Sequence, residues 1–184
     1  MNLIVDIGNT SAKLAVFEEG ELKECVRCSN QTLDALPALC RKYTIRKGIV
    51  SSVVSLTDEV RQVLAGLPFS MMEFNHQTPI PIRNLYKTPA TLGMDRLAAV
   101  IGAYTMQPSH PILVIDAGTC ITFDFIDELG NYHGGNISPG MEMRFKALHR
   151  FTSKLPEVSP EGEAPFYGQS TETAIRSGVI RGIE

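Results

Sequence analysis

Two short segments of the chain carry nearly the same residues, of types suited to binding phosphate. Residues 3–10 read Leu-Ile-Val-Asp-Ile-Gly-Asn-Thr, and residues 113–119 read Leu-Val-Ile-Asp-Ala-Gly-Thr. Each apolar run is expected to form a buried strand whose end presents an aspartate able to hold a metal ion. The glycine lets the chain reverse and lets backbone N–H groups approach a ligand, and such turns form anion-binding concavities. Two such turns, 110 positions apart, indicate a duplicated fold that binds a polyphosphate from both sides.

The first segment continues to a lysine and offers most of what phosphoryl transfer requires. That reaction depends on charge neutralisation and positioning more than on covalent chemistry. A carboxylate, a turn of backbone donors, polar side chains and an ammonium lie within eight residues, namely Asp6, Ile7, Gly8, Asn9, Thr10, Ser11, Ala12 and Lys13. The alternative is a plain hairpin with an exposed Lys13, and the second copy at Asp116–Thr119 favours phosphate binding over it.

A second group of candidate residues begins a predicted helix at Gly93-Met94-Asp95-Arg96. The Asp95 carboxylate could accept a proton from a substrate hydroxyl, and the Arg96 guanidinium could bind a substrate carboxylate with its planar fork. A proline-rich loop that carries Tyr86 precedes this group. The alternative is an ordinary first-turn acid beside its neighbour, which the spacing alone favours.

A third candidate segment is glycine-rich and runs from Gly134 to Gly140, directly before a predicted helix. Glycines in this position let a ligand approach the helix N-terminal amides, which carry partial positive charge. A plain loop remains the alternative for a single glycine-rich turn.

The elements that must position these residues alternate between strands and helices, which predicts an α/β fold. Strands are expected over residues 2–6, 12–17, 22–28, 45–54, 111–116, 121–126 and 132–137, and helices over 33–43, 57–67, 92–106, 141–153 and 170–184. A break at residues 107–111 predicts an N-terminal domain over 1–107 and a C-terminal domain over 108–184. Since the second is much the smaller, we expect it to be incomplete at its C-terminus.

Composition and charge narrow the class of protein. The net charge of −3 argues against nucleic-acid or acidic-membrane binding, and no apolar run approaches the roughly 20 residues that span a bilayer. With no secretory signal at the N-terminus, a cytoplasmic location is expected. The cysteines are expected to be structural thiols and the scattered histidines are not expected to be metal ligands; these residues are Cys25, Cys28, Cys40, Cys120, His76, His110, His133 and His149.

The motifs together, in this order, closely resemble the type III pantothenate kinases. The matching patterns are Asp-x-Gly-Asn-Thr-x-x-Lys at 6–13, Gly-x-Asp-Arg at 93–96, Asp-x-Gly-Thr at 116–119, Gly-Gly-x-Ile-x-Pro-Gly at 134–140 and Gly-x-Ser-Thr at 168–171. The resemblance covers the whole chain. The sequence departs from the family at Cys120, where a small residue is common, and family members continue further at the C-terminus.

The resemblance implies a fold, a reaction and a set of site residues. The fold is two ribonuclease-H-like domains with mixed sheets flanked by helices, of the actin, sugar kinase and heat-shock ATPase superfamily. The reaction is ATP-dependent phosphorylation of pantothenate, the first step of coenzyme A biosynthesis, by a homodimer. ATP phosphates are expected along residues 6–13 and at Thr119.

The remaining roles that the resemblance implies concern the acceptor and the metal ions. Asp95 is the expected base, and pantothenate is expected to contact Tyr86, Gly93, Met94, Arg96 and Thr171. Magnesium is expected at Asp6 through the phosphates, and a monovalent cation, potassium or ammonium, at Asp116.

Two other functions stay open from the residues. A kinase of the same superfamily that acts on a sugar or a carboxylate would keep both phosphate-binding turns but would lack the Gly-x-Asp-Arg signature. A non-catalytic regulator, such as an accessory transcription factor, could keep the fold without turning over ATP. The lack of a basic patch argues against the regulator.

Overall fold

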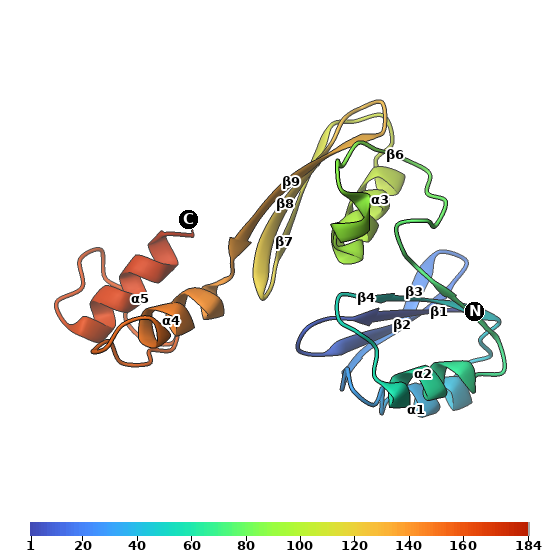
Figure 1. Ribbon diagram of the computed structural model, residues 1–184, viewed down its shortest axis with the longest axis horizontal. Helices are drawn as coiled ribbons and strands as arrows, with labels where there is room; N and C mark the ends of the chain where they lie inside the picture. The colour runs from blue at the N-terminus through green and yellow to red at the C-terminus, as the bar shows by residue number, and fades with distance from the viewer. Residues whose placement is uncertain (184) are drawn as a thin grey trace. The chain divides into compact units, whose positions relative to one another are not determined.

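The computed structural model describes residues 1–183, and the chain forms two compact units. The first unit comprises Met1–Ile82 and Tyr86–Gly102, and the second comprises Arg83–Leu85 and the chain from Ala103 onward. Each unit holds its own mixed β-sheet accompanied by helices (Figure 1). The units interleave in sequence at Arg83–Leu85, and the division into domains 1–107 and 108–184 stays a prediction.

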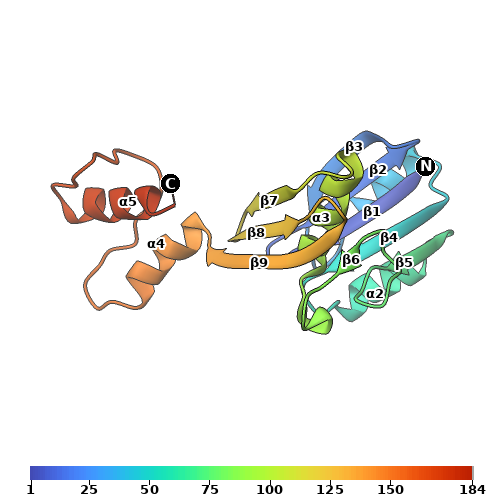
Figure 2. The same cartoon turned by 90° about the horizontal axis from the view of Figure 1, so that it is seen from above.

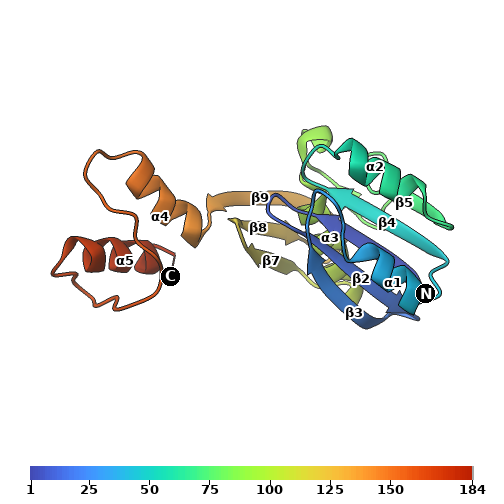
Figure 3. The same ribbon diagram turned by 90° about the horizontal axis from the view of Figure 1, so that it is seen from below.

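A five-stranded sheet forms the centre of the first unit (Figure 2). Its strands are β1 (Asn2–Ile7), β2 (Ala12–Glu18), β3 (Glu21–Cys28), β4 (Lys47–Ser52) and β5 (Ser70–Glu73), in the order β3-β2-β1-β4-β5. Strands β1, β2 and β3 form antiparallel pairs, whereas β1, β4 and β5 run parallel. The crossovers into the parallel strands contain helices α1 (Leu36–Lys42) and α2 (Asp58–Ala65), which lie on one face of the sheet (Figure 3).

Successive side chains of β1 alternate between a buried face and the opposite face, which carries Asp6. Leu3, Val5 and Ile7 are fully buried in a core shared with α1 and α2, and burial of each contributes about 1.5–3 kcal/mol. Ile4 and Asp6 point to the opposite face and are only half-buried. The core thus holds the strand in place, while its polar end stays accessible.

Local signals fix where the helices of the first unit begin. The Thr57 hydroxyl accepts a hydrogen bond from the Val60 N–H at 3.2 Å, so α2 has the predicted N-cap. Helix α1 begins at Leu36 rather than at the predicted residue 33. The reason is that Leu33 has a left-handed φ of 52°, which an α-helix excludes.

A four-stranded sheet forms the second unit together with two helices. Its strands are β6 (Arg83–Asn84), β7 (Ile112–Ala117), β8 (Cys120–Ile126) and β9 (Asn131–Pro139), in the order β6-β9-β8-β7. Helices α4 (Met141–Arg150) and α5 (Thr171–Arg181) follow, with a small core of their own that includes Phe145 and Val179. Between β6 and β7 in sequence lie a short 3₁₀ helix, η1 (Pro89–Thr91), and helix α3 (Met94–Met106), whose residues are shared between the units.

The antiparallel strands β7, β8 and β9 repeat the pattern of β1, β2 and β3, which confirms the predicted repeat of strands and turns. The sequence did not predict β5 and β6, which are four and two residues long and carry too few positions for a periodic signal. The helix predicted over 141–153 ends at Arg150, and that over 170–184 ends at Arg181; Glu184 lies outside the described residues. Over residues 1–183, no helix combines the length and apolar character needed to cross a membrane.

Candidate active site

The first Asp-x-Gly turn joins β1 to β2 through Gly8, Asn9, Thr10 and Ser11. Asp6 and Lys13 lie opposite each other in the antiparallel register, so their side chains share one face of the sheet. The Gly8 N–H donates to the Ser11 carbonyl at 3.0 Å and closes the turn, which leaves Asn9 and Thr10 exposed at its tip. A carboxylate, an ammonium and exposed polar groups are therefore gathered within one turn, as phosphate and metal binding require.

The side chain of Asn30 braces this turn from outside. Its Nδ2 amide donates to the carbonyl oxygens of Gly8 and Asn9, at 2.9 and 3.0 Å. Sequence reasoning missed Asn30, because the contact spans more than 20 positions and only a polar run after β3 marks it. The shape of this turn therefore depends on Asn30 as well as on the four residues of the turn itself.

The second Asp-x-Gly turn joins β7 to β8, and the glycine-rich third segment packs on it. The Gly118 N–H donates to the Cys120 carbonyl at 2.9 Å, and the Gly140 N–H donates to the Thr119 carbonyl at 3.0 Å. A side chain at Gly140 would collide with the Gly118 and Thr119 carbonyls, so only glycine allows this approach. Because Gly140 is also the N-cap residue of α4, the N-terminal amides of that helix begin beside the turn. Asp116, at the end of β7, and Thr119 are both exposed.

The third group of predicted residues lies at the start of α3. The Asp95 carboxylate accepts a hydrogen bond from the Arg96 N–H at 2.9 Å and folds back over Gly93, where any side chain would collide with it. The Arg96 side chain is buried, and its guanidinium lies 5.8 Å from the centre of the Tyr86 ring. The predicted acid, the predicted arginine and Tyr86 are therefore brought together, with Asp95 exposed.

A cavity of about 300 Å³ adjoins this helix start within the first unit. Gly93 and Met94 line it together with Asn75 and His76, which follow β5. It lies at the carboxyl ends of β4 and β5, the edge where open α/β sheets bind ligands. Sequence reasoning did not connect Asn75 and His76 with this region, because the short β5 that brings them there was not predicted.

Thr171 is the first residue of α5 and belongs to the second unit. Ser170 caps that helix, since its hydroxyl accepts from the Thr173 N–H at 3.2 Å, as predicted for the cap. Thr171 is exposed and lines a wide groove between α4 and α5. The predicted site residues therefore divide between the units: residues 6–13, 86 and 93–96 lie in the first, and Asp116, Thr119 and Thr171 lie in the second.

Metal binding at the first turn would depend on a bound phosphate. Within residues 1–183, no three His, Cys, Asp or Glu side chains gather into a cage. Magnesium is typically held by one or two carboxylates together with substrate phosphates, and Asp6, with the hydroxyl and amide oxygens of the turn, supplies hard oxygen ligands of that kind. The residues present therefore fit a magnesium ion that arrives with a polyphosphate. All four cysteines are free thiols, and their predicted structural role stays a prediction.

The two mixed sheets flanked by helices, each with an Asp-x-Gly turn, define a protein of the actin, sugar kinase and heat-shock ATPase fold class. A solved Campylobacter jejuni structure, described as a conserved protein of the Baf family, shares this fold with a TM-score of 0.57 at 22% identity, over 98% of this chain and 75% of that one. The family model for type III pantothenate kinase matches residues 2–184, and the chain belongs to that family.

Curated relatives agree with this assignment. A type III pantothenate kinase of Phocaeicola vulgatus is 64% identical, and one of Bacteroides fragilis is 56% identical. Each alignment covers 100% of this chain and 76% of the relative. The chain therefore spans about three quarters of the length of these proteins.

Proposed function

We propose that this chain carries out its family's reaction with Asp95 as the general base. That reaction is the ATP-dependent phosphorylation of pantothenate to 4′-phosphopantothenate, the first step of coenzyme A biosynthesis. The observation that carries the residue assignment is the start of α3. There an exposed carboxylate lies over a glycine, beside a buried arginine and a cavity.

The ATP phosphates are proposed to bind along the first turn, with Thr119 of the second turn as a further contact. The binding residues are Asp6, Ile7, Gly8, Asn9, Thr10, Ser11, Ala12, Lys13 and Thr119. The Lys13 ammonium neutralises phosphate charge, and the exposed turn supplies polar donors. The hydrogen bonds from Asn30 support this role because they hold the turn in one shape before ATP binds.

Two cations accompany ATP in this proposal. Magnesium is held at Asp6 through the phosphates, and when bound it neutralises charge that develops on the transferred group. A monovalent cation, potassium or ammonium, is assigned to the exposed carboxylate of Asp116. The family's use of ATP with magnesium supports the first assignment, and the resemblance of the second turn to the family pattern supports the other.

Pantothenate is proposed to lie against Tyr86, Gly93, Met94, Arg96 and Thr171. The Arg96 guanidinium matches the carboxylate of pantothenate, since a planar fork can donate two parallel hydrogen bonds to it. The Tyr86 ring beside that guanidinium limits the directions in which the arginine can point. The cavity next to Gly93 and Met94 gives the acceptor space near Asp95.

The chemical step then needs one proton transfer and one displacement. Asp95 takes the proton of the acceptor hydroxyl as that oxygen attacks the γ-phosphorus of ATP, and the bond to the leaving ADP breaks. The carboxylate contributes by orienting the hydroxyl and by accepting its proton, an effect typically worth about 10²–10⁴-fold in rate.

We also propose, from the resemblance to the family, that the chain forms a homodimer and acts in the cytoplasm. The chain's net charge of −3 supports the absence of nucleic-acid and acidic-membrane partners.

The reaction is tested by measuring ADP release with and without pantothenate. Release that depends on pantothenate and yields phosphopantothenate by mass spectrometry is the expected result. Release that depends instead on a sugar or another carboxylate would identify a different kinase of the same fold. ATP binding without turnover on any acceptor would favour a non-catalytic regulator.

A further inference from the structure

Two adjacent serines at the end of β4 differ in what their hydroxyls bind. The Ser52 hydroxyl donates to the Val54 carbonyl at 2.7 Å and accepts from the Val54 N–H at 3.3 Å, which shapes the chain as it leaves the strand. The Ser51 hydroxyl is buried and has no hydrogen-bond partner among residues 1–183. A buried hydroxyl without a partner destabilises the chain that contains it, whereas alanine at the same place would be nearly neutral or stabilising.

The strand register places Ser51 beside the residue assigned to magnesium. Asp6 pairs with Ser51 across the parallel β1–β4 pair and with Lys13 across the antiparallel β1–β2 pair. Side chains at paired positions project from the same face of a sheet, and neighbouring strands lie about 4.8 Å apart. Ser51, Asp6 and Lys13 therefore form a row across three strands, with the carboxylate in the middle.

We propose that Ser51 is a positioning residue for Asp6, and that its hydroxyl donates a hydrogen bond to the Asp6 carboxylate when magnesium and nucleotide are bound. A metal-binding carboxylate needs partners that fix its orientation, and loss of such a partner typically costs 10–100-fold in metal affinity or activity. The inference rests on the proposed function, because it takes Asp6 as the residue that holds magnesium.

The test compares Ser51→Ala, Ser51→Thr and the matched control Ser52→Ala in the full chain. Calorimetry measures ADP binding as the magnesium concentration is raised, and thermal unfolding without ligands measures stability. Ser51→Ala should require a magnesium concentration higher by a factor of about ten or more to reach the same ADP binding as the unchanged chain. Its Tm should be unchanged or higher. Ser51→Thr keeps the hydroxyl and should restore the magnesium dependence. Ser52→Ala should lower Tm and leave the magnesium dependence as it is.

Two results would overturn the proposal. The first is an unchanged magnesium dependence in Ser51→Ala; if Tm also fell, the hydroxyl would have a purely structural role. The second is equal impairment in Ser51→Ala and Ser51→Thr, which would make side-chain size the cause.

Asp6→Asn separates this inference from the function on which it rests. If Asp6→Asn binds magnesium and ADP like the unchanged chain, the magnesium assignment fails and Ser51 has no carboxylate to position. If Asp6→Asn is impaired and Ser51→Ala is not, the magnesium assignment stands and only the role of Ser51 fails.

Discussion

At the scale of single residues, the glycine before α3 leaves room for the carboxylate of the assigned base. A side chain at position 93 would collide with the Asp95 carboxylate where it now lies, and the carboxylate would have to move. The carboxylate also stands in the first turn of α3, where the helix dipole favours negative charge. The hydrogen bond from the Arg96 N–H and the helix dipole therefore both favour the ionised carboxylate at this position.

Asp95→Asn should therefore lower kcat far more than it weakens substrate binding. Asparagine keeps the size of the side chain and an oxygen that accepts from the Arg96 N–H, but it cannot take a proton. A loss of about 10²–10⁴-fold in kcat with little change in the KM for pantothenate is expected from steady-state kinetics. Asp58→Asn, which removes an exposed first-turn acid from α2, serves as the control. A kcat for Asp95→Asn close to that of the control would refute the assignment.

Site residues that belong to a short sequence motif could be predicted from the sequence. Site residues that are placed by contacts between distant parts of the chain were missed. Asp6 and Asp116 stand out because each lies in a repeated segment, and the structure places both at strand ends as predicted. Asn30 and Ser51 are brought to the first turn by strand pairing and by contacts over more than 20 positions. Their importance follows from geometry that no short motif encodes.

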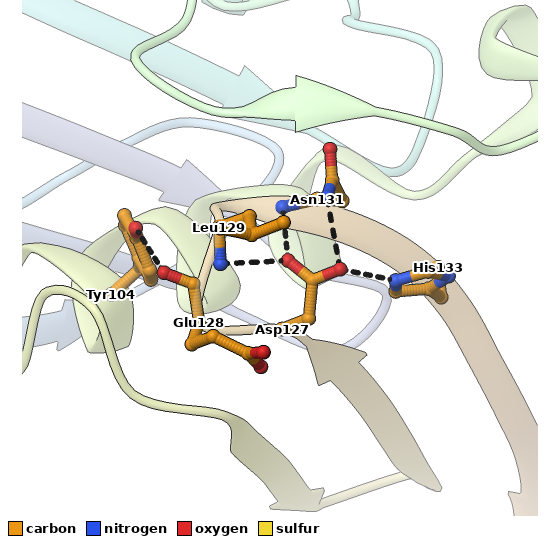
Figure 4. A network of polar contacts seen from close by, with 6 residues as sticks. All are labelled: Tyr104, Asp127, Glu128, Leu129, Asn131 and His133. Carbon is orange, nitrogen blue, oxygen red and sulfur yellow. Dashed lines mark hydrogen bonds and ion pairs between the residues drawn. The ribbon is translucent and has the colours of Figure 1, made fainter.

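At the scale of elements, the β8–β9 hairpin is fixed by a single carboxylate (Figure 4). Asp127 Oδ1 accepts from the N–H groups of Leu129 and Asn131, at 3.0 and 2.8 Å. Its Oδ2 accepts from the Asn131 amide at 2.9 Å and from the His133 ring at 2.8 Å. These hydrogen bonds, that of His133 foremost, hold the pKa of Asp127 well below its usual 3.8.

This low pKa makes the hairpin's contribution to stability dependent on pH in a defined direction. Because the folded chain binds the proton more weakly than the unfolded chain, the contribution is complete above about pH 5 and is lost progressively as the pH falls further. Asp127→Asn, which removes two of the acceptor interactions, should lower Tm at pH 7. The difference in Tm from the unchanged chain should shrink below about pH 4.

Glu128→Gln is the matched control, because it removes the neighbouring negative charge without touching the hydrogen bonds of Asp127. It should leave the pH profile of Tm unchanged. A constant difference in Tm between Asp127→Asn and the unchanged chain from pH 7 to pH 3 would show that the carboxylate's charge has no part in the hairpin's stability.

The elements that could be predicted are those with a regular pattern of apolar residues or a clear helix cap. The long strands of both repeats and the capped helix α2 were predicted, since alternation and the Thr57 cap are local features. Strands β5 and β6 escaped because they are extended only through pairing with β4 and β9. Strand β5 leads directly to Asn75 and His76, which line the cavity beside α3. Strand β6 pairs with β9, and Arg83–Leu85 therefore belong to the second unit.

At the scale of the whole molecule, duplication gives each unit one Asp-x-Gly turn at the end of its first antiparallel strand pair. The first turn is braced by Asn30, and the second is covered by Gly140 at the start of α4. The two turns are therefore equivalent in position but stabilised by different partners. If the nucleotide binds at both turns, as proposed, its binding should stabilise both units.

That dependence predicts how nucleotide binding changes thermal unfolding. A ligand at 100 times its Kd adds about 2.7 kcal/mol to the folded state, which for a chain of this size corresponds to a rise in Tm of about 5–10 °C. ATP with magnesium should produce this rise. ATP with a chelator should produce much less, because the ion that would link Asp6 to the phosphates is then removed. Asp6→Asn in the first unit and Asp116→Asn in the second should each reduce the shift, whereas Asp58→Asn should not. If only the Asp6 variant reduced it, ATP binding would depend on the first turn alone, and two proposals would fail: that Thr119 contacts the phosphates, and that a cation at Asp116 assists nucleotide binding.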